Sequence, residues 1–226
     1  MTDYHYAYLT GTLIFGIFWL ILFALRKDLR REMFAVGLCI GILAPLWAPW
    51  FFNDYWQPQY AWFFGLEDFL YGFFGGGIVS VVYEEAYGKR FSMRKNRHHR
   101  WWVFLFAACL GSAAIFQFLS HIGVNSIYAA LYAYLFFSAF LCHFRRDLWQ
   151  DAVASGLLFV AITFVFYGIF VSLYPDIIHA WWKVHNLSGV FILGAPIEEL
   201  LWAFGMGMAG GPFYEFISGR RLVRRR

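Results

Sequence analysis

The sequence predicts an all-α integral membrane protein with seven transmembrane helices, the N-terminus outside and the C-terminus inside. Of its 226 residues, 61% are hydrophobic and 23% aromatic, and the mean hydropathy of +0.56 is too high for a soluble domain of this length. Seven apolar stretches are each long enough to cross a bilayer, which requires roughly 17–25 residues. Lysine and arginine are concentrated in alternate connections between these stretches. We therefore expect a multi-pass protein of the cell inner (plasma) membrane.

The seven apolar stretches follow one another with short polar connections. They run over Tyr8–Leu25, Met33–Phe52, Trp62–Val82, Trp101–Ser120, Asn125–His143, Ala152–Tyr174 and Gly189–Phe216. The first lacks a basic leading region and ends in RKDLRR, which favours a membrane anchor over a cleaved signal peptide. The three cysteines lie within the stretches without metal-ligand spacing, so we expect them to pack as small apolar residues.

Positive charge predicts the orientation. Of 18 lysines and arginines, only Lys183 lies outside four clusters, at positions 26–31, 89–100, 145–146 and 220–226. The positive-inside rule places all four clusters in the cytoplasm. The basic segment KRFSMRKNRHHR is then a topology signal that also meets anionic lipid headgroups, so the lipid bilayer and no nucleic acid is the expected partner. His98 and His99 within it are expected to face solvent.

An acidic segment occurs twice. EDFLYGFFGGGIVSVVYEEAYGKR begins at Glu67, and EELLWAFGMGMAGGPFYEFISGRR begins at Glu198. RKDL at Arg26 and RRDL at Arg145 extend the similarity, with the second copy 12 residues longer between these points (53 residues against 41). The pattern predicts a first three-helix repeat (1–90), a basic loop with a connector helix (91–123), and a second repeat with a basic tail (124–226), both in the same orientation.

Small residues recur at matching places in the two acidic segments. Gly72, Gly76 and Ser80 correspond to Ala203, Gly207 and Gly211. Rows of this kind let membrane helices approach closely. We infer that the third and seventh helices pack together or frame one cavity, with both acidic pairs at its outer-leaflet end.

The paired carboxylates are candidates for proton chemistry. Ionisable groups within membrane segments are costly and indicate function, and the pairs Glu67-Asp68 and Glu198-Glu199 fall in helix first turns, where the macrodipole favours them. Burial and repulsion oppose this, so one member of each pair can remain protonated and act as acid beside a base. Ion pairing, helix capping and a cation path are alternatives, although the spans contain no lysine or arginine partner.

Other candidate groups are weaker. Tyr83-Glu84 and Tyr214-Glu215, at the cytoplasmic ends, are interpreted as structural. His179, His185 and Asp176 share an outward loop with Trp181 and Trp182, which favours an interfacial aromatic belt over a metal site. A retinal Schiff base would need a lysine within a span, and none is present.

GAPIEELLWAF and GLEDFLYGFF resemble the glutamate-rich signature of the lycopene cyclase domain family, the integral-membrane carotenoid cyclases of heterodimeric and fused type. The resemblance covers nearly the whole chain. It implies a redox-neutral isomerase in which a carboxylic acid protonates a linear polyene end group, a neighbouring alkene attacks the cation, and a base removes a ring proton. Glu198 and Glu199 match the motif best as catalytic residues, followed by Glu67 and Asp68.

The resemblance also implies a hydrophobic polyene or isoprenoid substrate, no cofactor and no metal. Trp202, Tyr71, Phe74 and Phe204 are the expected substrate-binding aromatics, whose faces stabilise a carbocation. The sequence departs from the family pattern with Trp202-Ala203 in place of an aromatic pair, Gly65 for proline and Asp68 for glutamate. A non-catalytic isoprenoid-binding protein and a proton or cation pathway therefore remain alternatives, and a homo-oligomer remains open.

Overall fold

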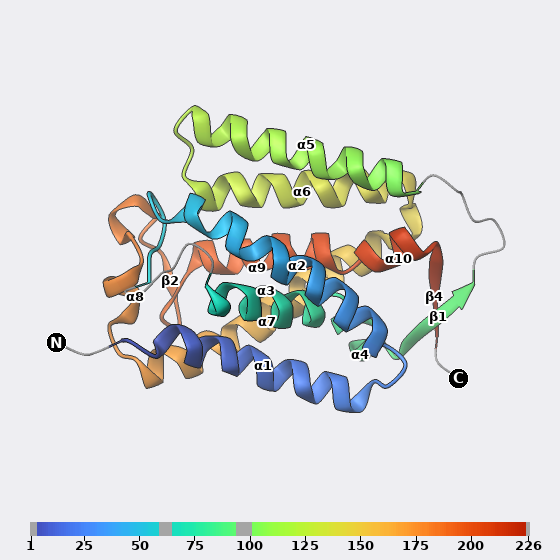
Figure 1. Cartoon of the computed structure of the whole chain (residues 1–226), viewed down its shortest axis with the longest axis horizontal. Coiled ribbons are helices and arrows are strands. Elements are labelled where there is room, and N and C mark those ends of the chain that lie inside the picture. Colours follow the sequence, from blue (N-terminus) through green and yellow to red (C-terminus); the bar gives the residue numbers. More distant parts are fainter. Residues whose placement is uncertain (1–3, 59–64, 94–100, 225–226) are drawn as a thin grey trace.

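Long helices that run alongside one another form the body of the structure (Figure 1). The computed structural model describes residues 4–58, 65–93 and 101–224. Its main helices are α1 (Ala7–Leu25), α2 (Arg30–Phe51), α3 (Leu66–Val79), α5 (Trp101–His121), α6 (Ser126–Phe144), α7 (Trp149–Leu173) and α9 (Ile197–Gly210). Shorter elements are α4 (Val82–Ala86), α8 (Ile177–Trp181), α10 (Phe213–Ser218), η1 (Arg146–Leu148), η2 (Val184–Asn186), β1 (Lys89–Met93), β2 (Phe191–Ile192), β3 (Ala195–Pro196) and β4 (Arg220–Arg224).

Five helices in the described part of the chain are long and apolar enough to cross a membrane. These are α1, α2, α5, α6 and α7, the last with the preceding η1. Their bounds lie within a few residues of five predicted stretches. An all-α membrane protein is thus confirmed in outline.

The helices α3 and α9 differ from the prediction in length. Each has 14 residues, or about 21 Å at 1.5 Å per residue, against about 30 Å of bilayer hydrocarbon. Each is followed, after a break, by a short helix, α4 or α10. Pro212 ends α9 because proline cannot continue the backbone hydrogen-bond ladder. A β2–β3 hairpin precedes α9, so this helix begins at Ile197 rather than Gly189. The predicted start at Trp62 lies outside the described residues, as do His98 and His99.

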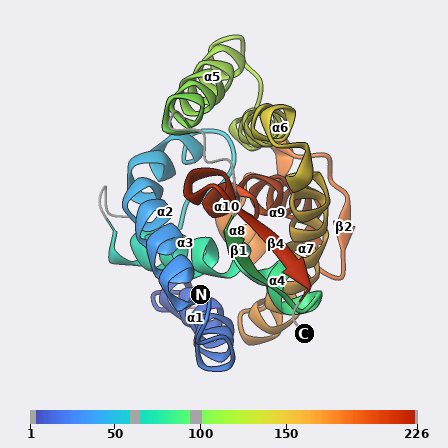
Figure 2. The same cartoon turned by 90° about the vertical axis from the view of Figure 1, so that its right-hand side faces the viewer.

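Helices α3 and α9 lie at the centre of the bundle. Helix α3 packs against α2 and α1, and α9 packs against α7 and α6. Helix α5 lies at the periphery beside α6, as the end view shows (Figure 2). Of the cysteines, Cys39 and Cys109 are exposed on the outside of the bundle and Cys142 is buried, all as free thiols.

The small-residue rows face a different neighbour from the one expected. A Cβ on Gly72 or Gly76 would meet Ala44 or Ile40 of α2, and one on Gly207 would lie 2.6 Å from the carbonyl oxygen of Ser155 in α7. The rows therefore bring each short helix close to its own neighbour, α2 or α7. Between α3 and α9 the contacts are instead made by larger side chains, such as Met206 against Gly75.

Backbone hydrogen bonds join distant segments at both ends of the bundle. At one end β1 pairs with β4 in antiparallel register, from Lys89 opposite Arg224 to Met93 opposite Arg220. At the other, Trp56 and Trp182 form an antiparallel bridge, with Gln57 N donating to Trp181 O and Lys183 N to Tyr55 O, both at 2.8 Å. The first and second halves of the chain are thus held together at each end.

Candidate active site

The acidic pairs occupy the first turns of α3 and α9, as predicted. Gly65 and Pro196 are the residues that precede these helices, and both have extended backbone that turns the chain into the helix. Both helices begin at the end of the molecule where the N-terminus lies (Figure 1). The two pairs are therefore at the same end of the bundle, on central helices.

Glu199 is buried and accepts hydrogen bonds from two aromatic side chains. The Tyr55 hydroxyl and Trp182 Nε1, the latter at 2.7 Å, both donate to Glu199 Oε1. Burial, and then the charge of Glu199, raise the pKa of Tyr55 well above its ordinary value. Tyr55 therefore remains a hydrogen-bond donor, and the carboxylate is held in place by neutral groups.

Glu198 has a different set of partners and one carboxylate oxygen without any. Its Oε1 accepts hydrogen bonds from the Tyr128 hydroxyl at 2.8 Å and from the backbone amide of Ser188 at 2.7 Å. Its Oε2 is buried with no hydrogen-bond partner among the described residues. A proton on this oxygen, or a group that approaches it, would satisfy it.

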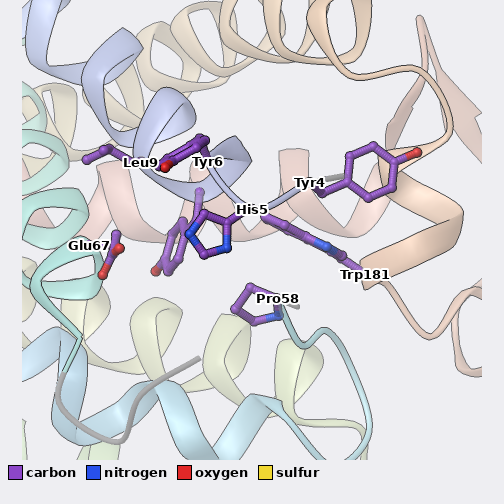
Figure 3. Close-up of a pocket in the computed structure, with 8 residues that line it drawn as sticks. Tyr4, His5, Tyr6, Leu9, Pro58, Glu67 and Trp181 are labelled. Atoms are coloured by element: carbon purple, nitrogen blue, oxygen red, sulfur yellow. The ribbon is translucent and has the colours of Figure 1, made fainter. Parts of the chain in front are cut away.

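Asp68 repeats the arrangement of Glu199 in the first half of the chain. It is buried and accepts a hydrogen bond from the Tyr8 hydroxyl. Its neighbour Glu67 is only half-buried. Figure 3 shows Glu67 at the side of a pocket of about 170 Å³, which is also lined by Tyr4, His5, Tyr6, Tyr8, Leu9, Pro58 and Trp181.

Asp68 and Glu199 both contact a connected group of five aromatic side chains, which we refer to as the aromatic cluster: Tyr8, Trp56, Tyr71, Trp182 and Trp202. Tyr8 and Trp182 each contact a carboxylate and lie on either side of Trp56, with ring centroids 5.4 and 5.9 Å from it. Tyr71 lies 6.5 Å from Tyr8 and 6.4 Å from Trp202. Two buried carboxylates from opposite halves of the chain thus border one aromatic surface.

The four predicted substrate-binding residues do not lie together. Tyr71 and Trp202 are neighbours in the aromatic cluster. Phe74 instead packs against Trp19 of α1, with centroids 6.0 Å apart, and Phe204 packs against Gly156 of α7.

The prediction of an interfacial aromatic belt is wrong for Trp181 and Trp182. Both are buried, at 5% and 9% exposure, because the loop that carries them folds back over the helix ends. His179, His185 and Asp176 are exposed. Tyr55 was not singled out from the sequence, because it lies in the short connection NDYWQP outside the repeated acidic segments.

A second group of carboxylates lies at the other end of the bundle, and its members are more deeply buried than the sequence suggested. Glu84 and Glu215 were expected to be interfacial, but they are 1% and 0% exposed. One carboxylate oxygen from each lies within 4.8 Å of the other and of an oxygen of Asp151. Asp151 was not predicted, nor was Glu32, which is also buried. Both follow a repeated arginine, Arg26 or Arg145, by six positions, so the duplication itself could have identified them.

The arginines of the repeated RKDL and RRDL motifs are buried at this end. Arg145 makes two hydrogen bonds to Asp147, at 2.9 and 2.8 Å, and donates to the backbone oxygen of Glu215 at 3.1 Å. Arg26 forms ion pairs with Asp28, two residues along the chain, and with the carboxylate of Glu85. Such pairs, with partners two residues along the chain, fix the turns that lead into α2 and α7.

Comparison with known proteins gives one match. The family model described as lycopene cyclase matches residues 125–217, which include α6, α7, α9 and the Glu198-Glu199 pair. No curated protein matches, and no solved structure does.

Proposed function

Because the lycopene cyclase family model matches residues 125–217, we propose that this chain is an isomerase that cyclises a linear polyene end group with its buried carboxylates. This match supports a membrane enzyme of carotenoid biosynthesis in general terms. The substrate is then a hydrophobic polyene of the lycopene type, and the reaction moves protons without a change of redox state.

The observation that carries the mechanism is the pair Asp68 and Glu199, both in contact with the aromatic cluster. Proton-initiated cyclisation needs an acid that donates one proton and a base that accepts another, close to the same ring. Each of these carboxyls is buried and positioned by the hydroxyl of a tyrosine. A buried carboxyl of this kind can give or take a proton without competition from bulk water.

The steps balance as an isomerisation. A carboxylic acid adds a proton to the terminal double bond, which leaves a tertiary cation. The neighbouring double bond attacks this cation, closes the six-membered ring and moves the positive charge to a ring carbon. A carboxylate then removes a ring proton. Each aromatic face that contacts the cation stabilises it by roughly 0.5–2 kcal/mol.

The other two predicted acids, Glu198 and Glu67, have positioning roles beside Asp68 and Glu199 in this proposal. Glu198 binds the Ser188 amide and so holds the segment before α9 against the site, while its second oxygen remains available for a proton. Glu67 borders the pocket in Figure 3. This pocket, at about 170 Å³, is smaller than the about 300–1,000 Å³ of typical small-molecule sites, so entry of a polyene end group requires the lining side chains to separate.

The membrane arrangement belongs to the same proposal. We assign α3 with α4, and α9 with α10, as interrupted crossings that complete seven spans with the N-terminus outside. Residues 1–90 and 124–226 would then be two repeats in the same orientation, joined by the basic loop and connector helix of residues 91–123. The matching contacts of α3 with α1 and α2, and of α9 with α6 and α7, support this assignment.

Expression in cells that accumulate lycopene, with chromatography of the pigments, tests the function. We expect γ- or β-carotene to appear with the wild-type chain and to be lost with Glu199→Gln or Asp68→Asn. Glu85→Gln is the matched control, since Glu85 is partly exposed and pairs with Arg26 at the other end of the bundle. Unchanged lycopene in cells with well-inserted protein would count against a cyclase.

A second candidate is a proton or cation pathway. Buried carboxylates at both ends of the central helices favour it. A flux in proteoliposomes that is abolished by Glu199→Gln, together with unchanged pigments, would support this function in place of catalysis. A pigment that co-purifies without conversion would instead indicate a polyene-binding protein.

A further inference from the structure

Three buried carboxylates meet where α4, α7 and α10 come together, at the opposite end of the helices from the aromatic cluster (Figures 1 and 2). Glu84, Asp151 and Glu215 are 1%, 2% and 0% exposed. One oxygen from each lies within 4.8 Å of an oxygen from the other two. The proposed cyclisation uses none of them.

Most of their oxygens have no hydrogen-bond partner among the described residues. Both carboxylate oxygens of Glu215, Oε1 of Glu84 and Oδ2 of Asp151 are buried and unpartnered. The remaining oxygen of Asp151 accepts a hydrogen bond from the Ser155 hydroxyl at 3.0 Å. Carboxylates removed from water are costly unless they are neutralised or coordinate a cation.

Two buried arginines, Arg26 and Arg145, belong to the same end of the bundle. Arg145 donates to the backbone oxygen of Glu215 and makes two hydrogen bonds to Asp147. Arg26 forms ion pairs with Asp28 and Glu85. The three carboxylates converge on one space, where four of their six oxygens have no hydrogen-bond partner among the described residues.

We propose that Glu84, Asp151 and Glu215 bind one hard divalent cation. Carboxylate oxygens are the ligands that Mg²⁺, Mn²⁺ and Ca²⁺ prefer, and the Ser155 hydroxyl adds another oxygen beside them. Glu84 comes from the first half of the chain, and the other two ligands come from the second. The cation joins the two halves at the end where β1 pairs with β4. This proposal does not depend on the proposed cyclase activity.

Manganese binding to the purified full-length protein tests the site. The protein is treated with chelator in detergent and titrated with Mn²⁺, with free ion followed by electron paramagnetic resonance. We expect one Mn²⁺ per chain, displaced by Mg²⁺ or Ca²⁺, and a melting temperature that rises with Mn²⁺ concentration because the ion binds only the folded state.

Replacement of each carboxylate by the corresponding amide tests whether the ion binds at these three residues. Glu84→Gln, Asp151→Asn and Glu215→Gln are each expected to weaken Mn²⁺ binding by about 10–100-fold or more, since loss of a ligand costs at least as much as loss of an outer-shell partner. They should also abolish the rise in melting temperature. Glu85→Gln, one residue from Glu84, and Glu199→Gln, at the other end, are the controls and should bind Mn²⁺ normally.

Two results would overturn the proposal. Folded wild-type protein that binds no Mn²⁺, with an unchanged melting temperature, would mean that shared protons alone neutralise the carboxyls. This measurement requires no variant, so it stands even where a substitution prevents folding. Equal weakening by Glu85→Gln and Asp151→Asn would place the bound Mn²⁺ elsewhere.

Discussion

At the scale of single residues, the main feature is that acids at the proposed active site are held by neutral donors rather than by cations. Tyrosines contact Asp68 and Glu199, and the indole of Trp182 also donates to Glu199. A lysine or arginine in these places would fix the carboxylate in its charged form. Neutral donors position the group and still allow it to exchange a proton.

This arrangement leads to a prediction for Tyr55. Tyr55→Phe keeps the ring in its buried position and removes the hydrogen bond from its hydroxyl to Glu199. A hydrogen bond to a charged group contributes about 1.5–3 kcal/mol, so we expect cyclised product to fall by about 10–100-fold, measured as initial rate in isolated membranes.

Tyr132→Phe provides the control for this substitution. Tyr132 lies on α6 with 55% exposure, away from the carboxylates. It should retain the wild-type rate. A Tyr55→Phe enzyme as active as Tyr132→Phe would show that the hydroxyl of Tyr55 has no role in the reaction.

At the scale of the elements, close approach of backbones decides how α3 and α9 are held. A Cβ on Gly207 would lie 2.6 Å from the carbonyl oxygen of Ser155 and 2.7 Å from the Cα of Gly156. Both are backbone atoms, which cannot rotate away. Each short central helix is therefore fixed against one long neighbour by the absence of side chains.

We accordingly expect Gly207→Ala to push α9 away from α7. Overpacking of this kind costs about 1–3 kcal/mol, and it should appear as a lower melting temperature in detergent together with reduced cyclisation, because α9 carries Glu198 and Glu199. Gly168→Ala on α7 is the matched control, since a Cβ there would have no neighbour within 4 Å. Equal melting temperatures for the two variants would contradict this account of the packing.

Sequence reasoning predicted the elements better than their contacts. Apolar length identified α1, α2, α5, α6 and α7, because a bilayer imposes it directly. It overestimated α9, since Phe191 and Ile192 are apolar yet form a hairpin strand. The spacing of Gly72 and Gly76 showed that a helix would pack closely, but it carried no information about which helix would be the partner.

For the candidate site, the sequence indicated the repeated acids on the helices but not their hydrogen-bond partners from the loops. Glu67-Asp68 and Glu198-Glu199 were singled out because they are repeated, and Tyr71 and Trp202 through the family resemblance. Tyr55 and Trp182 come from loops, whose path over the helix ends depends on tertiary contacts that no periodicity records. Asp151 lay one residue before a predicted span and was passed over for that reason.

At the scale of the whole molecule, the proposed orientation is open to direct measurement. In a variant with all three cysteines replaced, a single cysteine at His121 should react with a membrane-impermeant maleimide added to intact cells, because this end is assigned to the outside. A cysteine at Lys27 should react only after the membrane is opened. Both positions are exposed, so reversed labelling would invert the assigned topology.

The loop at positions 53–57 contributes more to the whole molecule than its length suggests. Asp54 accepts hydrogen bonds from the amide and hydroxyl of Ser126, at 2.7 and 2.6 Å, and so binds the start of α6. Lys183 donates to the carbonyl oxygens of Phe52 and Asn53, at 2.8 and 2.9 Å. Together with the bridge between Trp56 and Trp182, these bonds close one rim of the bundle, as β1 and β4 close the other.

Closure at both rims constrains the route by which a hydrophobic molecule could arrive. Parting either rim would break several main-chain hydrogen bonds at once, whereas the helix walls between them are held mainly by side-chain packing. We therefore expect entry from the side, through the lipid-facing wall, so that a long polyene would pass from the hydrocarbon layer to the carboxylates without crossing water.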